Sequence, residues 1–347
     1  MSQEPNPKEP IRVGVVGLGM MGMTHLDAYT NQAHARVVAI ADMDEARRTG
    51  QVKAGGNIEG QAQGGFDFGS VKQYADAADL IADPDVQLVD VCLPTPAHAK
   101  FAILALEAGK HVLIEKPLAR TAEQAAQIVA AAERAPGLTM CAMCMRFWPG
   151  WTWLKDAVDQ RTYGPVHAAT FRRVAEHPGG AFYENGDACG GAILDLHIHD
   201  ADFVQYLFGM PEAVTSVGYA KITDQPDHVA TQYHFAGDAA PLVTAEGGWT
   251  MAKGFGFRME YTVNFADATA VFDLAKPEPL TLYRPGEEPQ AVALPEGMGY
   301  EHEIAYFLDR ISRGETPDRV TLASAADSVR LIEAEARSVA TGQRVAL

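Results

Sequence analysis

The sequence predicts an α/β fold that begins with a doubly wound parallel sheet and continues into an α+β region with a large, open, mostly antiparallel sheet. Up to residue 147, short apolar runs alternate with helix-like segments, which is typical of right-handed βαβ units. Beyond Pro149, short strand-like runs are joined by turns rich in glycine, proline and aspartate. We therefore expect a disordered lead over residues 1–10, one domain over 11–147 and a second over 148–347.

The expected elements of the first domain follow one another along the chain. Strands are expected over 13–16, 36–41, 86–93, 111–114 and 138–145, and helices over 24–29, 74–82, 99–108 and 121–134. The strands are short and apolar, as parallel strands are when helices cover both faces of their sheet. A glycine-rich surface loop is expected over 55–69.

The second domain has a different pattern. Strands are expected over 166–174, 213–221, 229–235, 242–251, 259–264, 268–273 and 280–283, and helices over 190–208, 301–313 and 322–341. Turn residues between successive strands indicate a largely antiparallel sheet.

A turn of sequence Gly-Leu-Gly-Met-Met-Gly follows the first strand. Gly17 permits the tight turn, Gly19 lets the backbone approach a pyrophosphate, and Gly22 lets the next helix pack against the strand. The phosphates then sit at the N-terminus of this helix, where Met20 and Met21 lie. Because strand, glycine turn, helix and a second strand come in the required order, the segment predicts a Rossmann dinucleotide-binding site.

An acidic residue, Asp42, ends the second strand about twenty residues after this turn. A carboxylate there accepts hydrogen bonds from both adenosine ribose hydroxyls and repels the additional phosphate of NADP, so NAD is the expected cofactor. Arg47 and Arg48 lie a few residues further on, and they keep NADP, or use of both cofactors, as an alternative.

Composition and charge argue against several classes of protein. The chain has 47% hydrophobic and 21% charged residues, as an ordinary globular protein does. Its net charge of −17 argues against a nucleic-acid or membrane-surface partner. No apolar run approaches the roughly 18 residues of a membrane span, and the polar first residues do not resemble a signal peptide. We therefore expect a cytoplasmic protein.

Four cysteines, Cys92, Cys141, Cys144 and Cys189, are too few and too scattered for a disulfide framework. Cys141 and Cys144 form a C-x-x-C pair, which in other proteins is redox-active or binds zinc. Here the pair lies in an expected strand, where residues three apart point to opposite faces, and no second cysteine pair accompanies it. We interpret these thiols as buried small side chains, and we expect no metal.

Lys116 follows the expected strand over 111–114 and so emerges at the carboxyl edge of the parallel sheet, where ligands of open α/β folds bind. Its ammonium group there can stabilise a developing alkoxide during hydride transfer or donate a proton in the reverse direction. An exposed lysine at a strand end is the structural alternative.

Residues 190–208 predict a helix on which Asp195, His199 and Asp202 share one stripe beside the apolar face. His199 is then placed to act as a base, with Asp195 or Asp202 fixing its tautomer, while His197 points elsewhere. A strand over the same residues would instead align Asp195, His197 and His199 as a metal site. Helical spacing favours the first reading, and a helix carrying a satisfied core histidine is the structural alternative.

With these motifs in order, nearly the whole chain resembles the Gfo/Idh/MocA oxidoreductase family. The resemblance rests on the glycine turn over 17–22, on Pro-Thr-Pro-Ala-His over 94–98, on Glu-Lys-Pro over 115–117, on the Asp195-x-x-x-His199 spacing of the inositol dehydrogenase branch, and on the closing segment from Glu303 to Gly342. His197 departs from the glycine that many members carry between the aspartate and the histidine.

The resemblance implies a Rossmann domain and a second domain whose open sheet forms a homodimer or homotetramer interface. It also implies that Lys116, Asp195 and His199 are the catalytic residues over the nicotinamide ring. The expected cofactor-binding residues are Gly17, Gly19, Met20, Met21, Gly22, Asp42, Pro94, Thr95, His98, Glu115 and Lys116. Candidate substrate contacts are Lys116, Arg146, Trp148, Arg172, Asp195 and His199, with Arg173 and His177 as further candidates. Pairing between structural elements is the alternative for the arginines.

We therefore expect NAD-dependent oxidation of a secondary alcohol on a sugar, a cyclitol or a related polyol. His199 takes the hydroxyl proton, Asp195 orients the His199 imidazole, and Lys116 stabilises the alkoxide. Two alternatives stay open. One is an NAD-dependent glycosidase that oxidises its substrate transiently, and the other is a dinucleotide-binding regulator without catalysis.

Overall fold

The computed structural model describes residues 9–51 and 65–347. Most of the expected lead over residues 1–10, and most of the expected loop over 55–69, lie outside the described residues. The chain forms two compact units. The parallel-sheet unit comprises Met1–Glu115, Gln127–Ala142 and Tyr300–Leu322, and the antiparallel-sheet unit comprises Lys116–Ala126, Met143–Gly299 and Ala323–Leu347. Each unit thus draws on several stretches of the chain, whereas the sequence predicts one boundary at residue 147.

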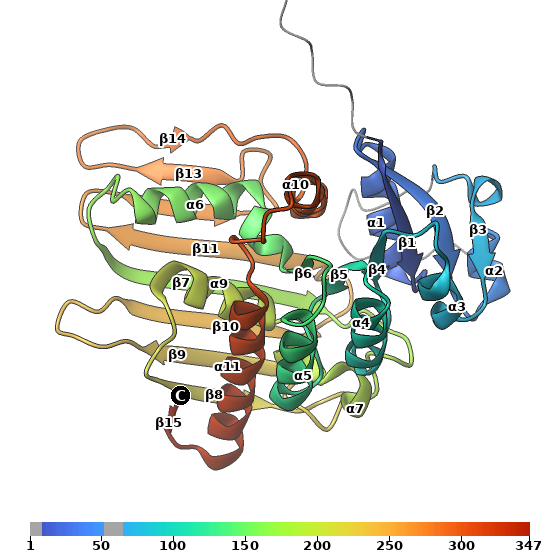
Figure 1. Ribbon diagram of the computed structural model, residues 1–347. Coiled ribbons are helices and arrows are strands. Elements are labelled where there is room, and N and C mark those ends of the chain that lie inside the picture. Colours follow the sequence, from blue (N-terminus) through green and yellow to red (C-terminus); the bar gives the residue numbers. More distant parts are fainter. Residues whose placement is uncertain (1–8, 52–64) are drawn as a thin grey trace, which may run out of the picture. The chain divides into compact units, whose positions relative to one another are not determined.

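The parallel-sheet unit contains a six-stranded sheet in the order β3-β2-β1-β4-β5-β6, and all neighbouring strands in it are parallel (Figure 1). Its strands are β1 Ile11–Val16, β2 Ala35–Ala41, β3 Lys72–Tyr74, β4 Leu88–Val91, β5 His111–Glu115 and β6 Thr139–Ala142. The order reverses between β1 and β4, which is where doubly wound sheets bind ligands. This confirms the predicted Rossmann sheet.

The helices of the first half of the chain are short and follow the expected alternation. They are α1 Met20–Thr30, α2 Glu45–Arg48, α3 Ala77–Ala82, α4 His98–Glu107 and α5 Ala122–Ala132, with 3-10 turns at Phe68–Ser70 and Thr95–Ala97. The helix expected over 74–82 begins only at Ala77, because Asp76 caps it and the preceding residues pair with β2 as the edge strand β3.

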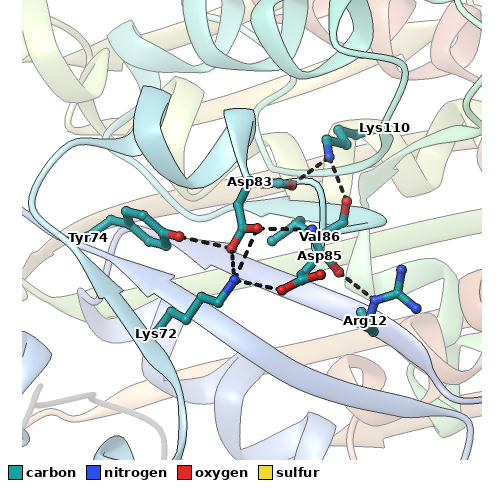
Figure 2. A network of polar contacts seen from close by, with 7 residues as sticks. All are labelled: Arg12, Lys72, Tyr74, Asp83, Asp85, Val86 and Lys110. Atoms are coloured by element: carbon teal, nitrogen blue, oxygen red, sulfur yellow. Dashed lines mark hydrogen bonds and ion pairs between the residues drawn. The ribbon is translucent and has the colours of Figure 1, made fainter.

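A network of polar contacts holds the turn before β4, at the amino edge of this sheet (Figure 2). The Asp83 carboxylate accepts hydrogen bonds from Lys72 Nζ and Tyr74 Oη, both at 2.9 Å. Lys72 Nζ also pairs with Asp85 at 2.7 Å. The Asp83 backbone carbonyl accepts a bond from Lys110 Nζ at 2.8 Å, just before β5. The network therefore ties the edge strand β3 and the start of β5 to one turn.

The antiparallel-sheet unit contains a nine-stranded sheet in the order β14-β13-β12-β11-β7-β10-β9-β8-β15 (Figure 1). Its strands are β7 Val166–Glu176, β8 Ala213–Tyr219, β9 His228–His234, β10 Leu242–Met251, β11 Phe257–Phe265, β12 Thr269–Asp273, β13 Leu280–Tyr283, β14 Gln290–Ala291 and β15 Val345–Ala346. Only β7 and β10 pair in parallel, so the sheet is mostly antiparallel, as predicted.

The chain beyond Ala142 contains more helices than the sequence predicts. They are α6 Pro149–Asp159, α7 Gly186–Cys189, α8 Gly191–Asp195, α9 Ile198–Phe208, α10 Gly299–Arg313 and α11 Leu322–Thr341, with a 3-10 turn, η3, at Cys144–Phe147. The expected strand over 138–145 ends at Ala142, because the chain turns into η3, so Cys141 and Cys144 do not share a strand. Among the residues described, no helix combines the length and the apolar character that crossing a membrane requires.

Aromatic side chains form the centre of the antiparallel-sheet core. Trp151 on α6 lies edge-on to Tyr261 and Phe272, with ring centroids 5.0 and 4.6 Å away. Phe203 on α9 contacts Trp151 and Phe171 of β7, both at 6.2 Å. These rings are almost completely buried, and such pairs stabilise a core by about 0.5–1.5 kcal/mol each beyond their burial. The core therefore anchors α6 and α9 to β7 and its neighbouring strands.

Candidate active site

The glycine turn after β1 has the backbone geometry that the sequence predicts. Gly17 has φ +89°, and a Cβ there would lie 2.5 Å from the carbonyl oxygen of Cys92. A Cβ at Gly22 would collide with the carbonyl oxygen of Gly17, so this glycine lets α1 approach the strand. A Cβ at Gly19 would meet no atom within 4 Å. Gly19 therefore borders open space, as a residue that a pyrophosphate approaches must.

The N-terminus of α1 is free to bind an anion. Gly19 is its N-cap, and no side chain caps the helix. The N–H groups of the first turn, at Met20 and Met21, are therefore left without a side-chain acceptor among the described residues, at the positively polarised end of an 11-residue helix. Together with the open space at Gly19, this turn fits the pyrophosphate of a dinucleotide.

Asp42 is fixed beside the glycine turn at the carboxyl end of β2. One carboxylate oxygen accepts a hydrogen bond from the Leu18 N–H and the other from the Asp44 N–H, each at 2.8 Å. Arg47 Nη1 lies 3.7 Å from the carboxylate, whereas Arg48 donates a 2.5 Å hydrogen bond to the Asp42 backbone carbonyl. The carboxylate is thus held in place beside the glycine turn, with the Arg47 guanidinium close to it.

The segment after β4 follows the same carboxyl edge. Thr95 and His98 are buried and Pro94 is exposed. The His98 Nε2 atom lies 2.7 Å from the Leu93 carbonyl oxygen, so one function of this imidazole is to fix the turn. Glu115 ends β5 at this edge and is also buried.

Lys116 and Asp195 contact each other in the antiparallel-sheet unit. Lys116 Nζ donates a 2.7 Å hydrogen bond to the Asp195 backbone carbonyl and lies 3.4 Å from the carboxylate oxygen Oδ1. Both side chains are mostly buried, at 12% and 17% exposure, which strengthens the pair relative to one in water. The ammonium group of Lys116 is therefore oriented by Asp195 while part of it stays accessible.

Asp195 and His199 lie on two helices, not on the single helix predicted over 190–208. Asp195 ends α8, and His199 lies in the first turn of α9. The N–H groups of Leu196 and His197 both bond to the Ala192 carbonyl, at 2.9 and 2.8 Å, which widens the turn between the helices. The strand reading of this segment, and the metal site that depended on it, are therefore wrong.

The His199 imidazole is held in its neutral form. Burial, together with the positive charges of Lys116 and Arg173, lowers the pKa of His199 well below its ordinary value. The imidazole is therefore neutral at neutral pH. Its Nδ1 atom lies 4.0 Å from the Cys144 sulfur, and no hydrogen bond joins it to Asp195 among the residues the structure describes. The expected orientation of His199 by Asp195 is thus not seen.

Asp202 does not orient His199 either, because it is bound to Arg146. Arg146 donates from Nε and Nη2 to the two oxygens of Asp202, at 2.9 and 2.6 Å, and from Nη1 to Ser324 Oγ at 3.1 Å. Ser328 Oγ donates a further 2.7 Å bond to Asp202. Arg146 is only 3% exposed. This buried pair fixes η3 to α9, and we withdraw Arg146 as a substrate contact.

Arg172 is turned away from α9. Side chains alternate along β7, and Arg173 reaches Asp200 of α9 at 2.8 Å, so Arg172 lies on the opposite face of the sheet. There it pairs with Glu246 at 2.9 Å and with Glu260 at 3.6 Å. Arg172 is therefore a residue of the open sheet face and not a substrate contact beside His199.

The remaining candidates have structural contacts of their own. Trp148 is buried, and His177 accepts a bond from the Gly179 N–H and lies edge-on to Trp249. The His197 side chain contacts α11 and β10. Its Nε2 atom lies 2.9 Å from Glu335 of α11, and its ring packs against Gly247 of β10. No sequence signal could have revealed this partner, because 138 positions separate the two residues.

Models of a single protein family match both parts of the chain. The model described as an oxidoreductase family with an NAD-binding Rossmann fold matches residues 11–142, and the model of the Gfo/Idh/MocA C-terminal domain matches residues 151–271.

Characterised relatives share about a third of their aligned residues with the chain. Levoglucosan dehydrogenase of Pseudarthrobacter phenanthrenivorans is 30% identical over 69% of this chain and 60% of its own length. Myo-inositol 2-dehydrogenase of Thermotoga maritima is 30% identical over 57% of this chain and 55% of its own, and D-glucoside 3-dehydrogenase of Escherichia coli is 30% identical over 62% and 60%. The alignments thus span about three fifths or less of these relatives.

Solved structures match the fold over almost the whole chain. Levoglucosan dehydrogenase in complex with NADH and levoglucosan superposes with a TM-score of 0.82, at 23% identity, over 97% of this chain and 99% of that one. GenD2 from gentamicin A biosynthesis, in complex with NAD, superposes with a TM-score of 0.80 at 22% identity, over 100% and 99%. At these identities the likeness establishes the fold.

Proposed function

Because the chain belongs to the Gfo/Idh/MocA oxidoreductase family, we propose that it is an NAD-dependent dehydrogenase that oxidises a secondary alcohol of a sugar, a cyclitol or a related polyol. The observation that carries the proposal is the pair formed by an oriented cation and a neutral base in the antiparallel-sheet unit. Lys116 is held by Asp195, and its charge helps to keep His199 unprotonated. A protein that only binds dinucleotide has no use for this acid–base pair, which is why we prefer an enzyme to a regulator.

Each side chain of this site has one task in the proposed reaction. His199 accepts the proton of the substrate hydroxyl, for which a neutral imidazole is required. Lys116 stabilises the negative charge that develops on the substrate oxygen, and Asp195 keeps the ammonium group in position. The alcohol loses a hydride from carbon and a proton from oxygen and becomes a ketone.

We propose that NAD binds to the parallel-sheet unit at the carboxyl edge. The bound nicotinamide supplies the hydride acceptor. The turn at Gly17, Gly19 and Gly22 would hold the pyrophosphate, and Asp42 would hold the adenosine ribose. The fixed Asp42 carboxylate favours NAD over NADP, and the nearby Arg47 supports some tolerance of NADP.

The names of the relatives support the substrate class. Relatives called levoglucosan, inositol and D-glucoside dehydrogenases all act on ring compounds that carry several hydroxyl groups. We therefore propose a cyclic polyhydroxylated substrate, with Lys116 and His199 contacting the hydroxyl group that is oxidised.

The first test is the absorbance of reduced nicotinamide during incubation with myo-inositol, levoglucosan, D-glucosides and other polyols, with NAD and NADP supplied separately. We expect a signal with NAD that disappears in Lys116→Ala and His199→Asn. Lys155→Ala is the matched control, because Lys155 lies in the same unit and contacts Asp159 and the Tyr206 ring, neither of which belongs to the proposed site. Cleavage of a glycoside without net NADH would replace the proposal by the glycosidase alternative. NAD binding without turnover of any substrate would favour the regulator.

We also propose that the open face of the nine-stranded sheet joins two or four copies of the chain. The strand registers place the exposed side chains Val217, Tyr219, Leu242 and Tyr283 on the same face as Arg172. Exposed apolar residues gathered on one sheet face support an interface. Leu242→Arg should lower the mass measured by light scattering, and an unchanged mass would contradict this interface.

The acidic charge and four free cysteines support a cytoplasmic location.

A further inference from the structure

A second group of ionisable side chains is buried in the parallel-sheet unit, between α1, β4, β5 and α10. His25 on α1 is fully buried and lies between two carboxylates. Its Nδ1 atom is 2.8 Å from Asp90 on β4, and its Nε2 atom is 3.1 Å from Glu115 at the end of β5. Glu303 on α10 and Cys92 after β4 complete the cluster. None of these five residues is needed by the proposed reaction as a proton carrier.

The charges of this cluster can be assigned from their surroundings. Burial opposes the charged form of His25, but the Asp90 carboxylate and the Cys92 sulfur outweigh it and raise the pKa of His25 well above its ordinary value. Burial raises the pKa of Glu303 well above its ordinary value, and both of its carboxyl oxygens lack a hydrogen-bond partner among the described residues. The raised pKa values favour the protonated forms of both His25 and Glu303.

His25 connects two neighbouring strands at the edge where the dinucleotide is expected. β4 and β5 pair directly, with Asp90 opposite Leu113 and Val91 opposite Ile114. Contacts from one ring to Asp90 and Glu115 therefore set the end of β5 relative to β4 and to α1. The contact with Glu115 lacks the alignment of a hydrogen bond, so the attraction between opposite charges carries it.

Glu115 is followed directly by Lys116, whose amine makes the 2.7 Å bond to Asp195. Consecutive Cα atoms are about 3.8 Å apart and joined by a planar peptide, so a displacement of Glu115 is transmitted to Lys116. We propose that His25 is a positioning residue for Lys116, because it holds Glu115 and so fixes the end of β5 from which the chain enters Lys116. The consequence for turnover rests on the proposed function, whereas the consequence for the position of Lys116 does not.

Three substitutions in the full chain separate this role from a general effect on folding. Glu115→Gln keeps the shape of the side chain and removes the charge that His25 holds. Glu303→Gln is the matched control, because it makes the same change in the same cluster at a carboxyl group whose raised pKa favours the neutral form. Asp83→Asn weakens the network of Figure 2, at the opposite edge of the same sheet, and controls for lost stability.

The first readout is the reactivity of the Lys116 amine, measured as the rate of reductive methylation with formaldehyde by peptide mass spectrometry, with Lys155 as internal reference. We expect Glu115→Gln to raise the rate at Lys116 about fivefold, since part of a charge-assisted hydrogen bond is lost. Glu303→Gln and Asp83→Asn should leave it unchanged. His25→Gln, which also removes the positive charge, should reproduce the effect and decides the question if Glu115→Gln does not fold.

The second readout is turnover with NAD and an active alcohol. We expect kcat to fall at least about tenfold in Glu115→Gln and in His25→Gln, toward the hundredfold loss that a 1 Å misplacement causes. Equal Lys116 reactivity in wild type and in both His25→Gln and Glu115→Gln would overturn the proposal. So would a stoichiometric transition metal in the purified chain, because the cluster would then be a metal site. If the wild type oxidises no alcohol, the proposed function fails, and the methylation rates still decide this inference.

Discussion

The buried pair of Arg146 and Asp202 should carry a large share of the stability of the antiparallel-sheet unit. Asp202→Ala removes three hydrogen bonds, at 2.9, 2.6 and 2.7 Å, and leaves the Arg146 guanidinium buried without its counter-charge. The two side chains are 3% and 1% exposed, so water cannot replace the lost partner. Removal of one member of such a pair costs about 3–5 kcal/mol. The free energy of unfolding of a typical domain is only about 5–15 kcal/mol in total.

Tryptophan fluorescence during urea unfolding measures this change in the correct unit, because all tryptophans lie in the antiparallel-sheet unit: Trp148, Trp151, Trp153 and Trp249. With a urea dependence of about 2–3 kcal/mol per molar, a loss of 3–5 kcal/mol lowers the midpoint by about 1–2 M. Asp159→Ala, which removes only an exposed pair with Lys155, should lower it by less than about 0.3 M.

A double variant tests the reasoning itself. In Arg146→Met with Asp202→Leu, no buried charge is left unpaired, so the midpoint should return to within about 0.5 M of the wild-type value. A midpoint of Asp202→Ala within about 0.3 M of wild type would refute the assignment of a buried, essential ion pair. A double variant as unstable as the single one would show that packing, and not the unpaired charge, causes the loss.

Three further outcomes follow from the site. Gly19→Val should weaken NAD binding by more than about tenfold in fluorescence titrations, because the added side chain occupies the space into which we propose the pyrophosphate binds. The melting temperature should be unchanged, because a Cβ at Gly19 meets no protein atom within 4 Å. Lys116→Met should raise the pKa of His199, measured by NMR titration of its imidazole, because the lysine charge lowers this pKa in the wild type; an unchanged pKa would separate the two residues. Burial opposes the charged form of His197, but Glu335 outweighs it and raises the pKa of His197 above its ordinary value. The His197–Glu335 pair therefore stabilises the folded state fully below about pH 6.5, and this stabilisation is lost as the pH rises through the raised pKa of the folded state. Glu335→Gln should make the urea midpoint fall less steeply over this pH range.

The parallel sheet and the dinucleotide turn were predictable because their signals are local. The apolar strand and the spacing of Gly17, Gly19 and Gly22 lie within one strand–turn–helix segment, and Asp42 is recognised by its distance from that segment. The same holds for α11, whose periodic apolar residues define its bounds at Leu322–Thr341. The edge strand β3 was missed, because three residues have too short a pattern to be distinguished from a helix start.

The catalytic candidates were predicted in part. The sequence identified Lys116 and His199 as chemical groups and placed His199 on a helix. The partner of Asp195 was predicted wrongly, since a regular helix would turn it toward His199. A turn widened at Ala192 separates α8 from α9, and Asp195 meets Lys116 instead. Such a local change of helical geometry depends on the packing around it and leaves no periodic signal.

The sequence by itself determined the fold class, the dinucleotide turn and the residue types of the candidate acid and base groups. Only the tertiary structure decided that Arg146 is buried and that Arg172 lies on the open sheet face. It also decided which carboxylate pairs with each arginine and histidine. Asp202 pairs with Arg146 across 56 positions, and His25 pairs with Asp90 across 65. Periodicity and spacing report on neighbours within a few turns of chain, whereas these charges find partners through the folding of distant elements onto one another, and the burial of the pair then sets its strength.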